Sequence, residues 1–248
     1  MDTEVAQRLI ALTKSFYQNL AAPFSATRGR LQPGVVRVLE KVPNEADVLD
    51  LGCGNGGVAR ELVRRGHRGR YVGVDSSEGL LEVAKSNAQS QMSKHPTSNV
   101  QFFLSDLASS DWNLQSLIPN LSFDFIFAFA VLHHLPSRDV RLSLLRQVHS
   151  LLAIRGRFVL SNWQFLNSPR LRERIQPWDW IGLSEEQVDE GDYLLDWRSG
   201  GSGLRYVHHF DEPELAELAK QTDFRVVDQF ASDGKGANLA LYQIWEKL

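Results

Sequence analysis

Cysteine is almost absent from this 248-residue sequence, because Cys53 is the only one. One cysteine cannot form an internal disulfide, and no pattern of metal ligands surrounds it, so we interpret Cys53 as a small packing residue. Long apolar runs and a charged-then-apolar leader are absent too. Both absences argue against membrane insertion and secretion. We therefore expect a cytoplasmic protein with no membrane partner, and a nuclear location stays open.

Charge of either sign is in no large excess: 27 Lys and Arg residues oppose 30 Asp and Glu residues, for a formal net charge of −3. This argues against an indiscriminately basic nucleic-acid-binding surface, although a local basic patch can outweigh the global charge. Internal repeats and low-complexity tracts are also absent. With 43% hydrophobic residues, the chain can bury one full-sized α/β core.

The most informative segment that is present reads as a buried strand running into a glycine-rich turn. It spans residues 48–57 and has the sequence Val-Leu-Asp-Leu-Gly-Cys-Gly-Asn-Gly-Gly. A second apolar segment, residues 71–75, ends at Asp75. Glycines let a backbone bend tightly and approach a ligand, and an acid at the end of the neighbouring strand can accept both hydroxyls of a ribose. The pattern predicts a cofactor that contains a nucleoside.

The glycine spacing alone leaves two cofactors open. Gly52, Gly54 and Gly57 also satisfy the dinucleotide pattern G-x-G-x-x-G, which would indicate an NAD-dependent oxidoreductase. Asp50 favours a different cofactor, because its carboxylate would repel a pyrophosphate but suits the ammonium and sulfonium groups of S-adenosylmethionine. A further acid, Asp106, follows a third apolar run, where it can accept a hydrogen bond from an adenine amino group.

Together these motifs resemble the class I S-adenosylmethionine-dependent methyltransferases, over roughly residues 46–163. The resemblance rests on D-x-G-x-G-x-G from Asp50, the acid after the second strand, S-D-L at 105–107 and V-L-H-H-L at 131–135. It implies S-adenosylmethionine as the cofactor. We expect no metal site, since no other ligand is spaced to join the two histidines. The residues expected to bind the cofactor are Tyr17, Arg28, Asp50, Gly52, Gly54, Asp75, Ser76, Asp106, Leu107, Ala128 and His133.

Apolar periodicity predicts alternating helices and strands. We expect helices at 3–20, 34–41, 58–65, 78–91, 138–152 and 212–220, and strands at 47–51, 70–74, 100–104, 123–127, 157–161, 224–230 and 237–245. The alternation implies a parallel sheet covered on both faces, and the last two strands imply an antiparallel hairpin. The expected fold is α/β, with a doubly wound, seven-stranded, mostly parallel Rossmann-like sheet, an antiparallel edge hairpin and a lid insertion.

We predict a single domain over residues 1–248. It comprises an N-terminal helical cap (1–45), a cofactor-binding core (46–162), a lid insertion (163–210) and a C-terminal helix with edge strands (211–248). Ligands in such sheets bind at the carboxyl ends of the strands. The choice of methyl acceptor must therefore come from the cap and the lid insertion.

The lid insertion is rich in tryptophan and arginine, which can stack a flat substrate and neutralise an anion. An alternative is a small hydrophobic subdomain with a solvated basic face. Five acids from Glu185 to Asp192 weaken any claim of a basic surface, and composition alone favours neither interpretation. The residues concerned are Trp163, Trp178, Trp180, Trp197, Arg170, Arg172, Arg174, Arg198 and Arg205.

A narrower resemblance involves segment 16–28, Phe-Tyr-Gln-Asn-Leu-Ala-Ala-Pro-Phe-Ser-Ala-Thr-Arg. It looks like the N-terminal segment of the tRNA wobble-uridine carboxymethyl methyltransferases, and weaker similarities follow at 191–197 and 205–210. The sequence departs from that group at Gln32, where we expect tryptophan, and at Gly57, where lysine is frequent. The C-terminal segment also lacks the usual tryptophan-rich end.

This resemblance implies tRNA as the substrate, a methyl ester of a uridine carboxymethyl group as the product and, commonly, a small activating protein partner. A carboxylate is already ionised at neutral pH, so no general base is needed. Catalysis would consist mainly of holding the oxygen in line with the methyl–sulfur bond in a site with little water. Arg28 or Arg205 would orient the acceptor carboxylate or the cofactor's own carboxylate through a bidentate contact, and Tyr17 would close over the cofactor. The catalytic candidates are Arg205, His208 and His209, with one of the histidines contacting the acceptor.

Other functions stay open at this stage. A methyltransferase for a small molecule would bury its acceptor beneath the lid, whereas an RNA enzyme needs an open cleft flanked by positive potential. A non-catalytic cofactor-binding subunit of a larger assembly would have a blocked acceptor site. The basic stretch from Arg60 to Arg70 can contact phosphates, or it can be the solvated face of a helix.

Overall fold

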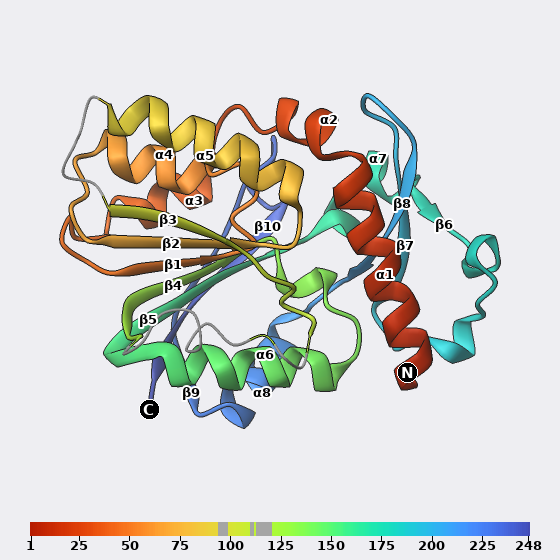
Figure 1. Cartoon of the computed structure of the whole chain (residues 1–248). Helices are drawn as coiled ribbons and strands as arrows, with labels where there is room; N and C mark the ends of the chain where they lie inside the picture. Colours follow the sequence, from red (N-terminus) through yellow and green to blue (C-terminus); the bar gives the residue numbers. More distant parts are fainter. Residues whose placement is uncertain (94–98, 110–111, 113–120) are drawn as a thin grey trace.

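The computed structural model describes residues 1–93, 99–109, 112 and 121–248, and Figure 1 shows how its layers are arranged. One face of the central sheet is covered by α3 (Pro33–Leu39), α4 (Gly57–Arg64) and α5 (Glu78–Met92), and the other by α6 (Arg138–Leu151) and α8 (Glu212–Gln221). The strands are β1 (Val48–Leu51), β2 (Arg70–Asp75), β3 (Asn99–Leu104), β4 (Phe123–Phe129), β5 (Leu152–Trp163), β9 (Phe224–Ser232) and β10 (Ala240–Lys247).

The strand order is β3-β2-β1-β4-β5-β10-β9. β1 pairs in parallel with β2 and β4, whereas β10 runs antiparallel to β5 and β9. The chain winds outward in both directions from β1 and β4, which places the ligand crevice at the carboxyl ends of these two strands. The expected fold is confirmed: a doubly wound, mostly parallel seven-stranded sheet with an antiparallel edge pair.

Local sequence explains where these elements begin. All four residues of β1 are buried, as expected for a central strand covered on both faces. The side chains of Ser77, Ser137 and Asp211 each accept a backbone N–H from the first turn of the helix that follows, so they cap α5, α6 and α8.

The lid insertion folds as a second, three-stranded antiparallel sheet in the order β6 (Ile175–Gln176), β7 (Asp192–Trp197) and β8 (Gly203–His208). Helix α1 (Thr3–Asn19) packs against β8 and also contacts α5 and the short α2 (Ala21–Ala26). Val5 and Leu9 of α1 share a buried cluster with Leu194 and Tyr206 of the lid. The described part of the chain also contains short helical turns: η2 (Leu132–His134), η3 (Phe165–Asn167), α7 (Pro169–Arg172), η4 (Trp178–Ile181) and η5 (Glu185–Gln187).

Several boundaries differ from the prediction. α1 ends at Asn19 and a second helix follows, and β5 begins at Leu152, directly after α6, rather than at residue 157. The last strand begins at Ala240 rather than at residue 237, because Gly234 and Ala237 form a turn with positive φ before it. Within the described ranges, no helix is long and apolar enough to cross a membrane.

Candidate active site

A cavity with a volume of about 550 Å³ lies at the carboxyl edge of the sheet, between the strand ends and the lid. Its lining comes from α1, the glycine-rich turn, the loops after β2, β3 and β4, and the lid insertion. All of the predicted cofactor residues except Ala128 belong to this lining: Tyr17, Arg28, Asp50, Gly52, Gly54, Asp75, Ser76, Asp106, Leu107 and His133.

The glycine-rich turn has a backbone conformation that favours glycine. Gly52, Gly54 and Gly56 have φ angles of +65°, +55° and +73°. A Cβ on Gly52 would lie 2.5 Å from Cγ2 of Val131, whereas a Cβ on Gly54 would meet nothing within 4 Å. The N–H of Gly54 donates to Asp75 at 2.8 Å. The turn therefore leaves open space in which a ligand can approach its backbone.

Asp50 is a buried carboxyl group at the end of β1. The Tyr71 hydroxyl donates to it at 2.6 Å. Burial raises the pKa of Asp50 to about 7, the hydrogen bond from Tyr71 acts in the opposite direction, and the nearby Asp75 adds to the rise. A cation bound beside such a carboxyl favours its ionised form. The environment of Asp50 therefore fits the positively charged end of S-adenosylmethionine.

Asp75 and Asp106 border the same cavity from the ends of β2 and β3. Burial raises the pKa of Asp75, while hydrogen bonds from the backbone N–H groups of Ser77 and Gly54 act in the opposite direction. Asp106 pairs with Lys14 of α1 at 3.0 Å. Asp75 and Asp106 would thus border the ribose and adenine of the cofactor, beside Asp50 on the adjacent strand end.

Arg205 of β8 is a buried cation that also lines the cavity; only 4% of it is exposed. Its Cζ lies 5.2, 5.0 and 5.6 Å from the ring centroids of Phe16, Trp163 and Trp197. Nη1 donates to the Tyr17 hydroxyl at 3.2 Å, and Nε has no hydrogen-bond partner. In the described part of the chain, no carboxylate pairs with this guanidinium. A cation held by aromatic rings without an acid suits an anionic ligand.

Four more arginines line the cavity: Arg28, Arg30, Arg170 and Arg174. Among the described residues none of them pairs with an acid, although other arginines do: Arg64, Arg65, Arg68, Arg70, Arg141, Arg198 and Arg225. Arg28 lines the cavity and is exposed to solvent, yet desolvation by the surrounding protein lowers the pKa of its guanidinium. The nearby Tyr17 raises this pKa, and the positive charge of Arg205 lowers it further. Three acids of the lining therefore lie at the strand ends, and the unpaired arginines lie in the cap and the lid. The lining also includes Asp196, which pairs with Arg198, and Asp233, which accepts a hydrogen bond from the Tyr242 hydroxyl.

Some of the lid tryptophans support a substrate-stacking lid, and one supports a small hydrophobic subdomain. Trp163 and Trp197 line the cavity, as stacking residues would. Trp178 is buried in a hydrophobic cluster with α1, and Trp180 is 62% exposed. The insertion is thus both a small hydrophobic subdomain and one wall of the site.

His133 and His134 both line the cavity. The backbone N–H of Trp163 donates to Nδ1 of His133 at 3.3 Å, and burial holds the pKa of His133 well below its ordinary value. Burial also lowers the pKa of His134 to about 3, and the positive charge of Arg205 adds to this effect. Both imidazoles are therefore neutral near pH 7.

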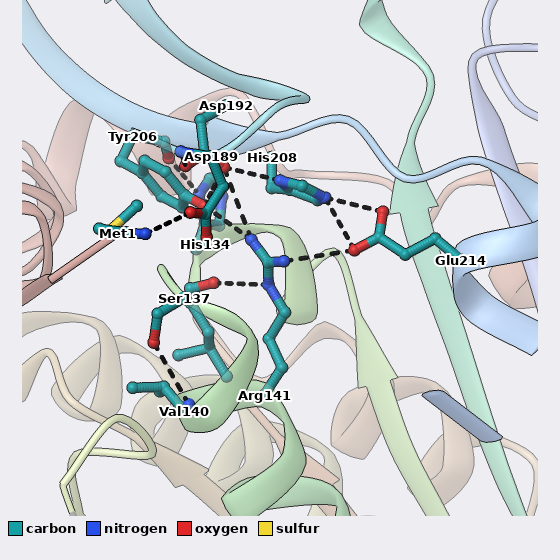
Figure 2. A network of polar contacts seen from close by, with 11 residues as sticks. Met1, His134, Ser137, Val140, Arg141, Asp189, Asp192, Tyr206, His208 and Glu214 are labelled. Carbon is teal, nitrogen blue, oxygen red and sulfur yellow. Dashed lines mark hydrogen bonds and ion pairs between the residues drawn. The ribbon is translucent and has the colours of Figure 1, made fainter. Parts of the chain in front are cut away.

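Three predicted site residues lie outside the lining. Ala128 is fully buried within β4. His208 is buried between Asp192 and Glu214, at 2.6 and 2.9 Å, in the polar network of Figure 2. The lining does not include His209 either. The structure therefore does not place His208 and His209 in the lining of the cavity. His208, at the end of β8, contacts Glu214 of α8 instead.

Sequence reasoning missed Lys14 and Arg30. The cavity-facing residues of α1 recur every three or four positions, at Ile10, Thr13, Lys14 and Tyr17. This is one face of a helix, so the placement of Tyr17 would have identified Lys14 one turn earlier. Arg30, in the loop after α2, has no comparable signal.

The basic stretch before β2 has acidic partners. Glu61 pairs with Arg64 and Arg65 at 2.7 Å, and Asp47 pairs with Arg70 at 2.9 Å. Arg68 pairs with Glu45. This pairing favours a solvated helix face over a phosphate-binding surface.

Comparison with known proteins agrees with this geometry. A family model described as a methyltransferase domain matches residues 24–229. The chain is 29% identical over 215 residues to a putative methyltransferase of Encephalitozoon cuniculi, covering 86% of this chain and 87% of that protein. It is 31% identical over 150 residues to a tRNA (carboxymethyluridine(34)-5-O)-methyltransferase of Saccharomyces cerevisiae, covering 59% of this chain and 46% of that protein. The chain thus matches less than half the length of the yeast relative.

Solved structures share the fold. A methyltransferase from Methanosarcina mazei, described as S-adenosylmethionine-dependent, superposes with a TM-score of 0.65 at 21% identity and covers 88% of this chain and 98% of that one. Magnesium protoporphyrin IX methyltransferase from Synechocystis, with bound S-adenosylmethionine, gives a TM-score of 0.60 at 16% identity, covering 95% and 97%. The match over residues 24–229 shows that the chain belongs to the methyltransferase-domain family.

Proposed function

We propose that this methyltransferase converts the carboxymethyl group of a tRNA wobble uridine into its methyl ester. The support from relatives is the similarity to the tRNA (carboxymethyluridine(34)-5-O)-methyltransferases of Saccharomyces cerevisiae and Macaca fascicularis, which are 31% and 28% identical over 150 residues. The proposal places the enzyme in the cytoplasm or nucleus. It includes a small activating protein subunit, because the group that segment 16–28 resembles commonly has one.

The observation that carries the proposal is the unpaired guanidinium of Arg205. A buried cation costs free energy unless a partner compensates it. Aromatic rings surround Arg205, but no acid pairs with it in the described ranges. A carboxylate acceptor would supply the missing charge through two parallel hydrogen bonds, for which arginine has the right planar geometry.

Other residues of the cavity would bind the cofactor. Asp50, Asp75 and Asp106 would hold the cofactor, and the open backbone at Gly54 leaves room for it. When bound, S-adenosylmethionine supplies a methyl group on a sulfonium, and transfer to a carboxylate oxygen leaves a neutral thioether and releases no proton. The protein therefore needs no general base. Its contribution is to orient the carboxylate and to exclude water.

Purified protein, with and without candidate small subunits, should be incubated with S-adenosylmethionine and tRNA that carries carboxymethyluridine, and the nucleosides analysed by mass spectrometry. We expect the methyl ester of carboxymethyluridine. Arg205→Gln should lower kcat/KM for tRNA by about tenfold or more, the loss of one charged hydrogen-bond pair. The affinity for S-adenosylmethionine should stay nearly unchanged.

Arg172→Gln is the matched control, since Arg172 is an exposed lid arginine outside the cavity lining. It should behave like the wild type. Methylation of a small carboxylate but not of tRNA would replace the tRNA substrate with a small molecule. No transfer to any carboxylate, with cofactor binding intact, would contradict the proposed function.

A further inference from the structure

A chain of hydrogen bonds links the lid to the guanidinium of Arg205 through His134. Nδ1 of His134 lies 3.0 Å from the backbone carbonyl oxygen of Tyr206. Nε2 of the same ring lies 2.8 Å from the hydroxyl of Tyr17. Arg205 Nη1 lies 3.2 Å from that hydroxyl. Three segments of chain, α1, η2 and β8, therefore meet through one imidazole and one phenol.

The chemistry of the partners fixes the direction of each hydrogen bond. A carbonyl oxygen only accepts, so Nδ1 of His134 must carry the proton. Because the ring is neutral, Nε2 then has a free lone pair and accepts from the Tyr17 hydroxyl. The oxygen of Tyr17 is left to accept from Arg205, since a guanidinium only donates. Protonation of Nε2 would reverse the middle hydrogen bond and break this sequence.

At the Arg205 end of this hydrogen-bond series, the guanidinium uses only one of its donor groups. Nη1 is bound to Tyr17, while Nε is buried without a partner, and no hydrogen bond from Nη2 is found among the described residues. Nε and Nη2 share the edge on which arginine takes a carboxylate with two parallel hydrogen bonds. The contact with Tyr17 therefore fixes the guanidinium and leaves its carboxylate-binding edge without a protein partner.

At the Tyr206 end of this hydrogen-bond series, a buried polar network anchors the side chain of Tyr206, whose backbone carbonyl accepts from His134 (Figure 2). The Tyr206 hydroxyl donates to Asp192 at 2.5 Å and accepts from Arg141 of α6 at 2.7 Å. Arg141 also donates to the carbonyl of Leu135 at 2.9 Å, directly after η2. The same arginine thus anchors both strand β8 and the turn that carries His134.

We propose that His134 is a positioning residue, whose Nδ1-protonated tautomer orients the Tyr17 hydroxyl and thereby holds Arg205 ready for an acceptor carboxylate. This role rests on the proposed function, because it assumes an acceptor that Arg205 binds. His134 itself transfers no proton to the substrate. Its effect is on acceptor binding rather than on cofactor binding.

Two substitutions at the same site separate the two hydrogen bonds of the ring. His134→Gln places an amide oxygen near the position of Nε2, where it can still accept from Tyr17. His134→Asn reaches only the position of Nδ1, so it can donate to the Tyr206 carbonyl but leaves the proton of the Tyr17 hydroxyl without an acceptor. We expect His134→Asn to raise the KM for tRNA about tenfold, roughly the worth of one hydrogen bond, and His134→Gln to change it by less than about threefold. The dissociation constant for S-adenosylmethionine should change by less than about twofold in both.

Tyr17→Phe tests whether His134 acts through the hydroxyl. In that background His134→Asn should cause little further loss, because the hydroxyl through which it acts is already gone. His149→Asn serves as the control, since His149 lies on α6, outside the cavity lining, against the ring of Phe224. Its kinetic constants should match the wild type. Equal and additive losses from His134→Asn and Tyr17→Phe would overturn the proposal.

A second measurement does not depend on turnover or on the identity of the acceptor. The ¹⁵N chemical shifts of the wild-type histidines should show His134 protonated at Nδ1 and unprotonated at Nε2 near neutral pH, whereas free histidine favours the other tautomer. Tyr17→Phe should shift the Nε2 resonance of His134. An Nε2-protonated His134 would overturn the inference even if the enzyme methylates carboxymethyluridine. If His134 has the expected tautomer but the enzyme does not methylate carboxymethyluridine, the result contradicts only the proposed function.

Discussion

At the scale of single residues, Asp50 gives the cofactor site its pH dependence. Its carboxyl has a pKa raised to about 7, chiefly by burial. A cation bound beside it favours the ionised form, so binding of S-adenosylmethionine should release a proton below about pH 7. The free protein should also lose stability as the pH rises from about 4 to about 7, because the unfolded chain gives up this proton more easily.

We therefore expect the affinity for S-adenosylmethionine to increase between about pH 6 and about pH 8. Calorimetry in two buffers of different ionisation enthalpy measures both the affinity and the released proton. Asp50→Asn should bind more weakly and lose this pH dependence. Asp228→Asn, at a half-exposed acid of β9 outside the cavity lining, should keep it. An unchanged pH profile in Asp50→Asn would show that another group is responsible.

The residues of the cofactor site differ in how far the sequence predicts them. Asp50 and the glycines after it form one contiguous motif, so their proximity needs no knowledge of the fold. His134 has partners 117 and 72 positions away, at Tyr17 and Tyr206. His208 was expected at the acceptor on resemblance alone, whereas Asp192 and Glu214 hold it elsewhere. Such contacts join residues that are far apart in the sequence and form only through tertiary packing, so local sequence patterns do not predict them.

At the scale of elements, the turn between β1 and α4 depends on Gly52. Alanine there would need a φ of +65° and would place Cβ 2.5 Å from Val131. We expect Gly52→Ala to lower the free energy of unfolding by about 1–3 kcal/mol and to weaken cofactor binding. Urea unfolding and thermal shifts with S-adenosylmethionine measure the two effects. Gly29→Ala, where a Cβ meets nothing within 4 Å, should be close to neutral, and a stable Gly52→Ala that binds normally would refute the steric argument.

His208 joins the lid to the core helices, because it lies between Asp192 of β7 and Glu214 of α8. Burial acts against its positive charge, but the hydrogen bonds to these two acids outweigh it and raise the pKa of His208. A raised pKa in the folded state stabilises the fold fully below the ordinary histidine pKa of about 6.5, and this stability is lost as the pH rises through the folded value.

The free energy of unfolding of the wild type should therefore exceed that of His208→Gln more at about pH 6 than at about pH 9. Urea titrations at both values measure this difference. Comparing the two proteins at each pH removes the contribution of Asp50, which is common to both. A difference that is constant with pH would mean that His208 is neutral in the folded protein.

The helices and strands of the core could be predicted from the apolar periodicity of the sequence, whereas the strands of the lid could not. Strands such as β1 and β4 are mostly apolar, and α5, α6 and α8 begin at side chains that can cap a helix, so the order of the elements predicts the doubly wound sheet. β6 has only two residues, and β7 carries Asp192 and Asp196 among its apolar residues. β7 pairs with β8, and β8 packs against α1 from a distant part of the chain. Only the composition of the lid indicated a binding surface.

At the scale of the whole molecule, the distribution of charge matters more than its sum. The net charge is −3, yet five arginines without acidic partners in the described ranges line one cavity, together with three acids at the strand ends and with Asp196 and Asp233. A cationic cofactor and an anionic acceptor fit a cavity that holds both carboxyl groups and unpaired guanidinium groups. The central claim is therefore that the methyl group goes to a carboxylate.

The most direct test uses S-adenosylmethionine labelled in its methyl group, with tRNA that carries carboxymethyluridine as the acceptor. A methyl ester is cleaved by mild alkali, whereas methyl groups on base nitrogen, base carbon or ribose oxygen resist it. We predict that the label transferred to tRNA by the wild type is released as volatile methanol under mild alkali and that Arg205→Gln transfers much less of it. Label that stays on the tRNA after this treatment would contradict a carboxylate acceptor.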